Sequence, residues 1–260
     1  MMSKREFEKL VEIMAVLRGE KGCPWDKEQT RQSLKPFLVE ETYEVLDAID
    51  EDDPAKIKEE LGDLLFQIVF HCQIAKERNE FDIHDVIEQI AEKMIGRHPH
   101  VFSDACYETS EEVLTQWEER KREEGKSRES ILEGIPKELP SLLKAHRVQA
   151  RASRVGFDWK QAEDVLVKLE EELQEFRKAL ENKDRREIED ELGDLFFVLV
   201  NISRFVSVNP EDALRKTISK FISRFRYIEM KAAESGKRLS EMTLQEMDAL
   251  WDEAKERKAQ

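Results

Sequence analysis

The chain has 260 residues, of which 40% are hydrophobic and 39% charged, with 9 glycines and 7 prolines. This length and composition predict a packed protein with room for two domains rather than a disordered chain. A formal net charge of −15 argues against a protein that binds nucleic-acid polymers, because such a protein needs a basic surface to neutralise phosphates.

The cellular compartment is predicted from the lack of a signal-peptide pattern and of a membrane-spanning segment in the sequence. Its charged, amphipathic N-terminal segment has no apolar core of the signal-peptide kind, and no run of about 18 apolar residues could span a bilayer. The three cysteines are far apart and form no CxxC pair, which is typical of thiols in a reducing compartment. We therefore expect a cytoplasmic protein that does not interact with a membrane.

Apolar residues recur every three or four positions in almost every segment, which predicts an all-α fold. In the first half we expect helices at 7–17, 33–49, 55–76, 82–95 and 110–124, with loops at 23–26 and 97–107. Glycine and proline then mark a linker at 126–140 between a first domain, 1–125, and a second, 141–260. After the linker the pattern restarts, with helices expected at 142–154, 165–180, 186–206, 210–234 and 244–258. The sequence thus predicts two tandem helical bundles.

The most informative repeat is acidic. The segment Glu-Leu-Gly-Asp-Leu occurs at 60–64 and again at 191–195, each time after a Glu-Glu-x-x-Glu segment. The acids are separated by 3, 16 and 3 residues in both halves. They are Glu41, Glu44, Glu60 and Asp63 in the first half, and Glu172, Glu175, Glu191 and Asp194 in the second.

This spacing predicts a metal site. Residues three apart share a helix face, and a turn within the 16-residue interval would fold two helices into an antiparallel hairpin on which four carboxylates converge. Their mutual repulsion is relieved by a divalent cation, and all-oxygen ligands favour Mg²⁺ or Mn²⁺. A single copy would be interpreted as a solvated helix face, but the repeated spacing favours the metal site. A di-iron site would require Glu-x-x-His pairs, which the sequence lacks.

Two further expectations concern the Glu-Leu-Gly-Asp-Leu segment. Apolar neighbours such as Leu192 and Phe196 predict that Asp194 is partly buried. The glycine is expected to permit a close approach of another backbone.

A second repeat is basic. Lys93 and Arg97 correspond to Lys220 and Arg224, and each pair is spaced i, i+4 on an expected helix. Such cations near a metal site suit a polyphosphate. Trp251, which corresponds to Trp117, could stack on a base. Surface ion pairing and core packing are the alternatives for these residues.

Together, EExxE, the ExxD of ELGD and the Lys/Arg helix resemble the MazG-type nucleoside triphosphate pyrophosphohydrolases, an all-α nucleotide pyrophosphatase family. The resemblance covers nearly the whole chain, including both halves. It implies a homodimer that uses Mg²⁺, with Mn²⁺ as a substitute. It also implies hydrolysis of a broad range of NTPs and dNTPs to the monophosphate and pyrophosphate, in a house-cleaning or stress-related role.

The resemblance also implies roles for individual residues. Glu172, Glu175, Glu191 and Asp194 would hold Mg²⁺, and Glu171 would orient the attacking water beside Glu172 and Glu175 at the catalytic centre. The substrate-binding set would be Lys168, Glu171, Asp190, Lys220, Arg224 and Trp251 in the second half, with Lys93 and Arg97 in the first. The second half is the expected active site, and the first half carries the corresponding acids and cations.

Two other functions remain open. The enzyme could be narrower, resembling a dUTPase or a hydrolase of modified nucleotides. The chain could also be a non-enzymatic helical module that regulates a protein partner in a stress response.

Overall fold

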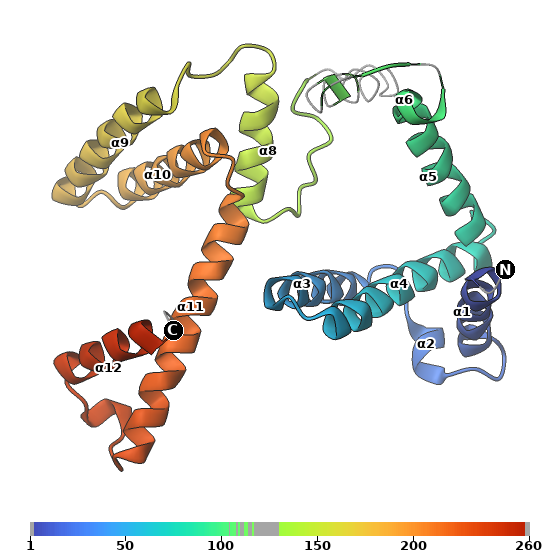
Figure 1. Cartoon of the computed structure of the whole chain (residues 1–260), viewed down its shortest axis with the longest axis horizontal. Helices are drawn as coiled ribbons and strands as arrows, with labels where there is room; N and C mark the ends of the chain where they lie inside the picture. Colours follow the sequence, from blue (N-terminus) through green and yellow to red (C-terminus); the bar gives the residue numbers. More distant parts are fainter. Residues whose placement is uncertain are drawn as a thin grey trace. The chain divides into compact units, whose positions relative to one another are not determined.

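The structure, a computed structural model, describes residues 3–103, 105–107, 109, 112, 113, 116 and 130–257. Within these residues every regular element is helical, which confirms the predicted all-α fold. The chain divides into two compact units, residues 1–126 and 127–260, and both can be followed in Figure 1. In the described ranges, no helix combines the length and apolar character needed to cross a membrane. The helix expected at 110–124, with Trp117, lies largely outside the described residues.

The first unit is built around an antiparallel hairpin of two long helices. Its helices are α1 (Ser3–Arg18), α2 (Pro24–Glu28), α3 (Lys35–Glu51), α4 (Pro54–Glu77), α5 (Ile83–Arg97) and α6 (Pro99–Phe102). Helices α3 and α4 form the hairpin, and α1 packs on α4. The core between them contains Met14, Leu34, Val69, Phe70 and Ile74.

Two short helices correct the expected loops at 23–26 and 97–107. Helix α2 begins at Pro24 and α6 at Pro99. Proline fits the first turn of a helix because its φ angle is already helical and the missing N–H has no partner there anyway. Pro24 and Pro99 therefore open helices of 5 and 4 residues within the segments expected to be loops.

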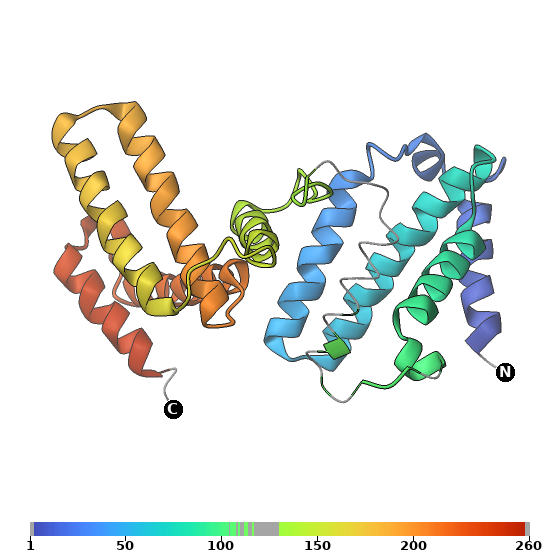
Figure 2. The same ribbon diagram turned by 90° about the horizontal axis from the view of Figure 1, so that it is seen from above.

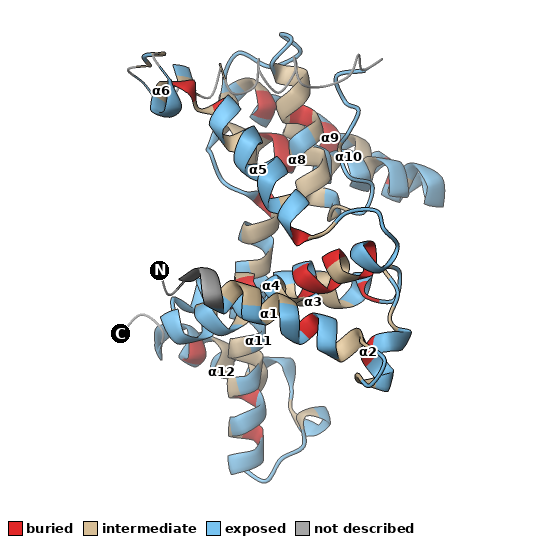
Figure 3. Cartoon of the chain, turned by 90° about the vertical axis from the view of Figure 1, so that its right-hand side faces the viewer, coloured by how far each residue is buried: buried red, intermediate tan, exposed pale blue. Residues whose placement is uncertain are grey.

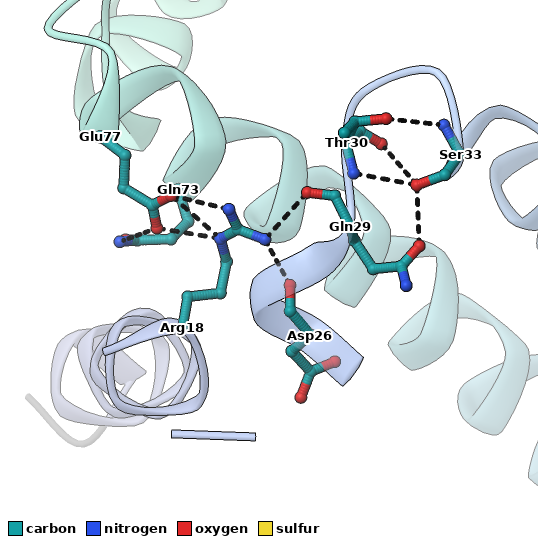
Figure 4. A network of polar contacts seen from close by, with 7 residues as sticks. All are labelled: Arg18, Asp26, Gln29, Thr30, Ser33, Gln73 and Glu77. Atoms are coloured by element: carbon teal, nitrogen blue, oxygen red, sulfur yellow. Dashed lines mark hydrogen bonds and ion pairs between the residues drawn. The ribbon is translucent and has the colours of Figure 1, made fainter. Parts of the chain in front are cut away.

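A buried arginine joins α1, α2 and α4 (Figure 4). Arg18 donates to the Glu77 carboxylate, with Nη2 2.7 Å from Oε2, and to the backbone carbonyls of Asp26 and Gln29. Its guanidinium also lies 5.3 Å from the centre of the Phe70 ring. Since only 7% of the Arg18 side chain is exposed, this network fixes the segment around α2 against the core.

The second unit repeats the hairpin. Its helices are α8 (Ser141–Ser153), α9 (Ala162–Asn182), α10 (Arg185–Phe205), α11 (Pro210–Glu234) and α12 (Leu244–Arg257), with a 3₁₀ turn η1 at Leu239–Glu241. Helices α9 and α10 run side by side in Figures 1 and 2, α8 packs on α10, and α11 packs on α8 and α12. Buried Gln149 of α8 donates to the Phe197 carbonyl of α10 at 2.8 Å, which fixes these two helices together.

The two hairpins close with the same turn. Asp52 and Lys183, at equivalent positions of the repeat, adopt the left-handed conformation with φ angles of 54° and 57°. The next residue caps the second helix in each case: Asp53 accepts the N–H groups of residues 55 and 56, and Asp184 those of 186 and 187. The duplication therefore extends from the acidic side chains to the backbone that places them.

Candidate metal centre

The α9–α10 hairpin brings acids from both helices together, as the spacing predicts. Oxygen atoms of Glu172, Glu175 and Glu191 all lie within 4.8 Å of one another. Glu172 is buried, whereas Glu175 and Glu191 are half-buried. Three carboxylates at this distance repel one another unless protons or cations neutralise them.

The α3–α4 hairpin gathers an equivalent cluster. Here Glu41, Glu60 and Asp63 approach within 4.8 Å of one another. The fourth predicted acid of each half, Glu44 or Asp194, lies outside the closest group but near enough to act electrostatically on it. Both predicted sets are thus assembled on their hairpins, with a different acid at the periphery in each half.

Desolvation and like charge raise the pKa of one acid in the second cluster, Glu191, and of Glu60 in the first. The pKa of Glu191 is raised by desolvation, and further by the charges of Glu175, Glu172 and Asp194. Desolvation and the charge of Glu44 likewise raise the pKa of Glu60. A bound cation would stabilise the charged form of such a carboxyl group, which burial and like charge disfavour.

Unpaired oxygens in both clusters fit a hard cation. Oε2 of Glu191 in the second half is buried without a hydrogen-bond partner, and so is Oε1 of Gln67 in the first. Buried oxygens normally have partners, and carboxylate and amide oxygens are the ligands that Mg²⁺ and Ca²⁺ accept. The donor sets therefore fit the divalent cation expected from the sequence.

Lys168 is a predicted substrate residue in direct contact with the second-half acids. Its Nζ lies 2.7 Å from Glu172 and 2.9 Å from Glu171, and these hydrogen bonds raise the lysine pKa. Glu171 and Asp190 are both exposed beside the cluster. A cation and two flanking acids thus line the accessible side of the site.

The remaining predicted phosphate residues lie elsewhere in the second unit. Helix α11 leads away from the α9–α10 hairpin (Figure 1). Lys220 is exposed, and Arg224 lies over the Trp251 ring, 5.2 Å from its centre. In the part of the chain that the structure describes, no ion pair joins Lys220 or Arg224 to the acidic cluster. The structure therefore places these residues on the α11–α12 pair, apart from the acids.

In the first unit, the corresponding cations are on α5. Lys93 is exposed, whereas Arg97 is 9% exposed and counts among the buried charged residues. Helix α5 packs against α4 and α6.

Two expectations about the Glu-Leu-Gly-Asp-Leu segment are wrong. Asp194 is exposed, because its apolar neighbours Leu192 and Phe196 are themselves 40% and 53% exposed. A Cβ atom added to Gly62 or Gly193 would meet nothing within 4 Å, so neither glycine is required by close packing inside one chain. Much of α9 and α10 is solvent-exposed in Figure 3.

The sequence analysis missed Gln67. It is buried in α4 and hydrogen-bonds the Glu41 carboxylate, which partly offsets the rise in the Glu41 pKa caused by desolvation and by Glu44 and Asp63. The available signal was a polar residue one helical turn after Asp63 within the apolar run Leu64–Phe70. A buried amide at that position indicates a polar partner on the facing helix.

Comparisons with known proteins agree with the duplication of the domain. The family model of the MazG nucleotide pyrophosphohydrolase domain matches the chain twice, at residues 29–102 and 160–228. The nucleoside triphosphate pyrophosphohydrolase/pyrophosphatase MazG of Thermotoga maritima is 49% identical over 96% of this chain and 95% of its own length. The nucleoside triphosphate pyrophosphohydrolase of Escherichia coli K12 is 43% identical over 96% and 97%, respectively. A crystal structure of a mazG-related protein from Thermotoga maritima is 30% identical, covers 44% of this chain and 98% of its own, and has a TM-score of 0.39.

Proposed function

Because the chain belongs to the MazG nucleotide pyrophosphohydrolase family, we propose that it hydrolyses nucleoside triphosphates to the monophosphate and pyrophosphate. The observation that carries this proposal is the acidic cluster of the α9–α10 hairpin, where three carboxylates lie within 4.8 Å and one buried oxygen has no partner. Such a site binds a divalent cation, and Lys168 beside it offers a positive charge for phosphate.

In the proposed reaction, Glu172, Glu175, Glu191 and Asp194 hold Mg²⁺, or Mn²⁺ in its place. A bound Mg²⁺ ion supplies charge neutralisation for phosphate oxygens and acidifies coordinated water. Glu171 is exposed next to Lys168, a position from which its carboxylate can orient water towards the α-phosphorus.

Charge on the phosphates is neutralised by side chains of the chain itself. Lys168 exchanges its carboxylate partners for phosphate oxygens. Lys220 and Arg224 would bind the leaving pyrophosphate, with Trp251 against the base, once α11 is brought to an acidic hairpin.

We propose that a homodimer provides this arrangement. Leu166, Leu173 and Leu180 recur every seven residues along α9 and are between 39% and 48% exposed. Leu192, Phe196 and Leu199 form a second exposed stripe on α10. Apolar stripes of this size on a soluble helix pair favour association, and a second copy gives α11 of one protomer access to the hairpin of its partner.

The proposed substrates are canonical NTPs and dNTPs, with little preference for the base, in a house-cleaning or stress-related role. The position of Lys168 beside the cluster supports this breadth, because its positive charge suits the phosphates that all these substrates share rather than one base.

Product analysis tests the proposal. Incubation with each NTP and dNTP and Mg²⁺ should release pyrophosphate and the monophosphate as the first products, and EDTA should stop the reaction. The variants Glu172→Ala and Glu41→Ala, measured separately, report which hairpin turns over. Release of orthophosphate first would refute a pyrophosphohydrolase. Retained activity in a variant that combines Glu41→Ala with Glu172→Ala would refute the acidic clusters as its site.

A further inference from the structure

The two acidic clusters differ at positions that contact them. In the 131-residue repeat, Lys168 of the second half corresponds to Phe37 of the first, and Gln67 of the first corresponds to Val198 of the second. Phe37 packs against the core of the first unit, with its ring 5.9 Å from that of Trp25. The second cluster therefore contains its own counter-ion in direct contact with Glu172, whereas in the first a neutral amide contacts Glu41. Lys56, which is paired with Glu51, acts on Glu60 only through its charge.

The Lys168 counter-ion is paired with Glu172, a predicted metal ligand. The Lys168 ammonium lies 2.7 Å from Oε1 of Glu172, so a divalent cation bound to Glu172 would meet a like charge at short range. A third of the Lys168 side chain is exposed, and its flexible stem lets the ammonium leave without disturbing the fold. It leaves at low cost only if another anion receives it.

We propose that Lys168 is an exchangeable counter-ion that couples metal binding to phosphate binding in the second half. Without phosphate, Lys168 neutralises Glu172 and Glu171 and opposes the entry of a bare cation. A polyphosphate removes the ammonium from Glu172, so metal and phosphate bind together. The first cluster, with Phe37 and Gln67 in these positions, binds a divalent cation without phosphate. This inference rests on the proposed function, since it assigns the order in which that site is filled.

The test uses the full chain with one cluster disabled. In a Glu41→Gln/Glu60→Gln background, only the second cluster remains to bind Mn²⁺, whose free concentration is followed by electron paramagnetic resonance without nucleotide. Lys168→Met should bind Mn²⁺ about two- to fivefold more tightly than the parent, the factor expected for one partly exposed ion pair. With saturating Mg²⁺, the same variant should bind pyrophosphate about tenfold more weakly.

The diagnostic result is that Lys168→Met strengthens Mn²⁺ binding and weakens pyrophosphate binding. A purely structural lysine would change both affinities in the same direction or neither, and either outcome overturns the counter-ion role. Lys168→Arg, which keeps the charge, should stay near the parent in Mn²⁺ affinity. Lys160→Met removes an exposed lysine eight residues earlier and should leave both affinities unchanged.

A separate titration tests the first cluster. In a Glu175→Gln/Glu191→Gln background, Mn²⁺ should bind without phosphate, and added pyrophosphate should change its affinity less than twofold. Absence of Mn²⁺ binding would overturn this half of the inference. None of these titrations requires turnover, so the two proposals can fail separately. If Lys168→Met changes the Mn²⁺ and pyrophosphate affinities in opposite directions but the protein releases no pyrophosphate from nucleotides, the proposed function is refuted and the role of Lys168 stands.

Discussion

Replacement of Glu172 by glutamine tests whether this buried acid serves the fold or the metal. Glu172 is 5% exposed, its carboxylate is paired with Lys168 at 2.7 Å, and it lies within 4.8 Å of two other acidic side chains. If Glu172 serves the fold, its ion pair with Lys168 should stabilise the protein. If it serves the metal, its carboxylate is held beside two acids that repel it, and its loss should cost little stability without metal.

The opposing electrostatic terms nearly cancel. A negative charge at 4.8 Å costs a carboxylate about 0.9 kcal/mol in bulk water and about 3.5 kcal/mol at an effective dielectric constant of 20. Two such charges therefore cost about 2 to 7 kcal/mol. One ammonium at 2.7 Å returns about 1.5 to 6 kcal/mol on the same scale. We expect Glu172→Gln, which removes both terms and keeps the volume, to change the free energy of unfolding in EDTA by less than about 1 kcal/mol.

Urea denaturation of the Glu41→Gln/Glu60→Gln background, in which only the second cluster remains, provides the assay, in EDTA and in saturating Mg²⁺ with pyrophosphate. The parent should gain about 2 to 3 kcal/mol from Mg²⁺ and pyrophosphate at a hundred times their dissociation constant, and the Glu172→Gln variant should gain much less. Pyrophosphate release should fall by about 100-fold or more, as for loss of a group that stabilises charge in a transition state. Destabilisation by more than about 2 kcal/mol in EDTA, with an unchanged gain from Mg²⁺ and pyrophosphate, would refute Glu172 as a ligand.

Three further results are expected. Arg18→Met should lower the free energy of unfolding by about 2 to 3 kcal/mol in urea, because Glu77 and two carbonyls lose a buried donor; the control Glu77→Gln, which keeps an acceptor, should cost less than half as much. In EDTA, the urea midpoint should rise as pH falls from 7 towards the raised pKa of Glu191, because the folded state then binds more protons than the unfolded state; a midpoint that falls over this range would contradict the raised pKa. The double variant Leu192→Asp/Phe196→Asp should be monomeric in light scattering yet remain helical by circular dichroism, and a dimer unchanged by these charges would exclude this stripe as the interface.

The elements and the acidic hairpins could be predicted because helical periodicity and an exact repeat are local properties of the sequence. The exposure of Asp194 could not, since it depends on Leu192 and Phe196 facing away from the core of their own unit. The separation of Lys220 and Arg224 from the acids is also non-local. Their i, i+4 spacing defines a helix face but not the direction in which α11 leaves the hairpin.

The two halves share the turn at Asp52 and Lys183 and the length of the segment between the acid pairs, but little of its sequence. Of the fifteen positions between the two acid pairs, only three are identical in the two halves: Ala48 and Ala179, Asp53 and Asp184, and Ile57 and Ile188. One inserted residue would turn the second helix by about 100° and carry its acids off the shared face. Divergence within this segment is therefore expected to proceed by substitution and to exclude single-residue insertions and deletions, so the hairpin can be transplanted or redesigned as a unit of fixed length.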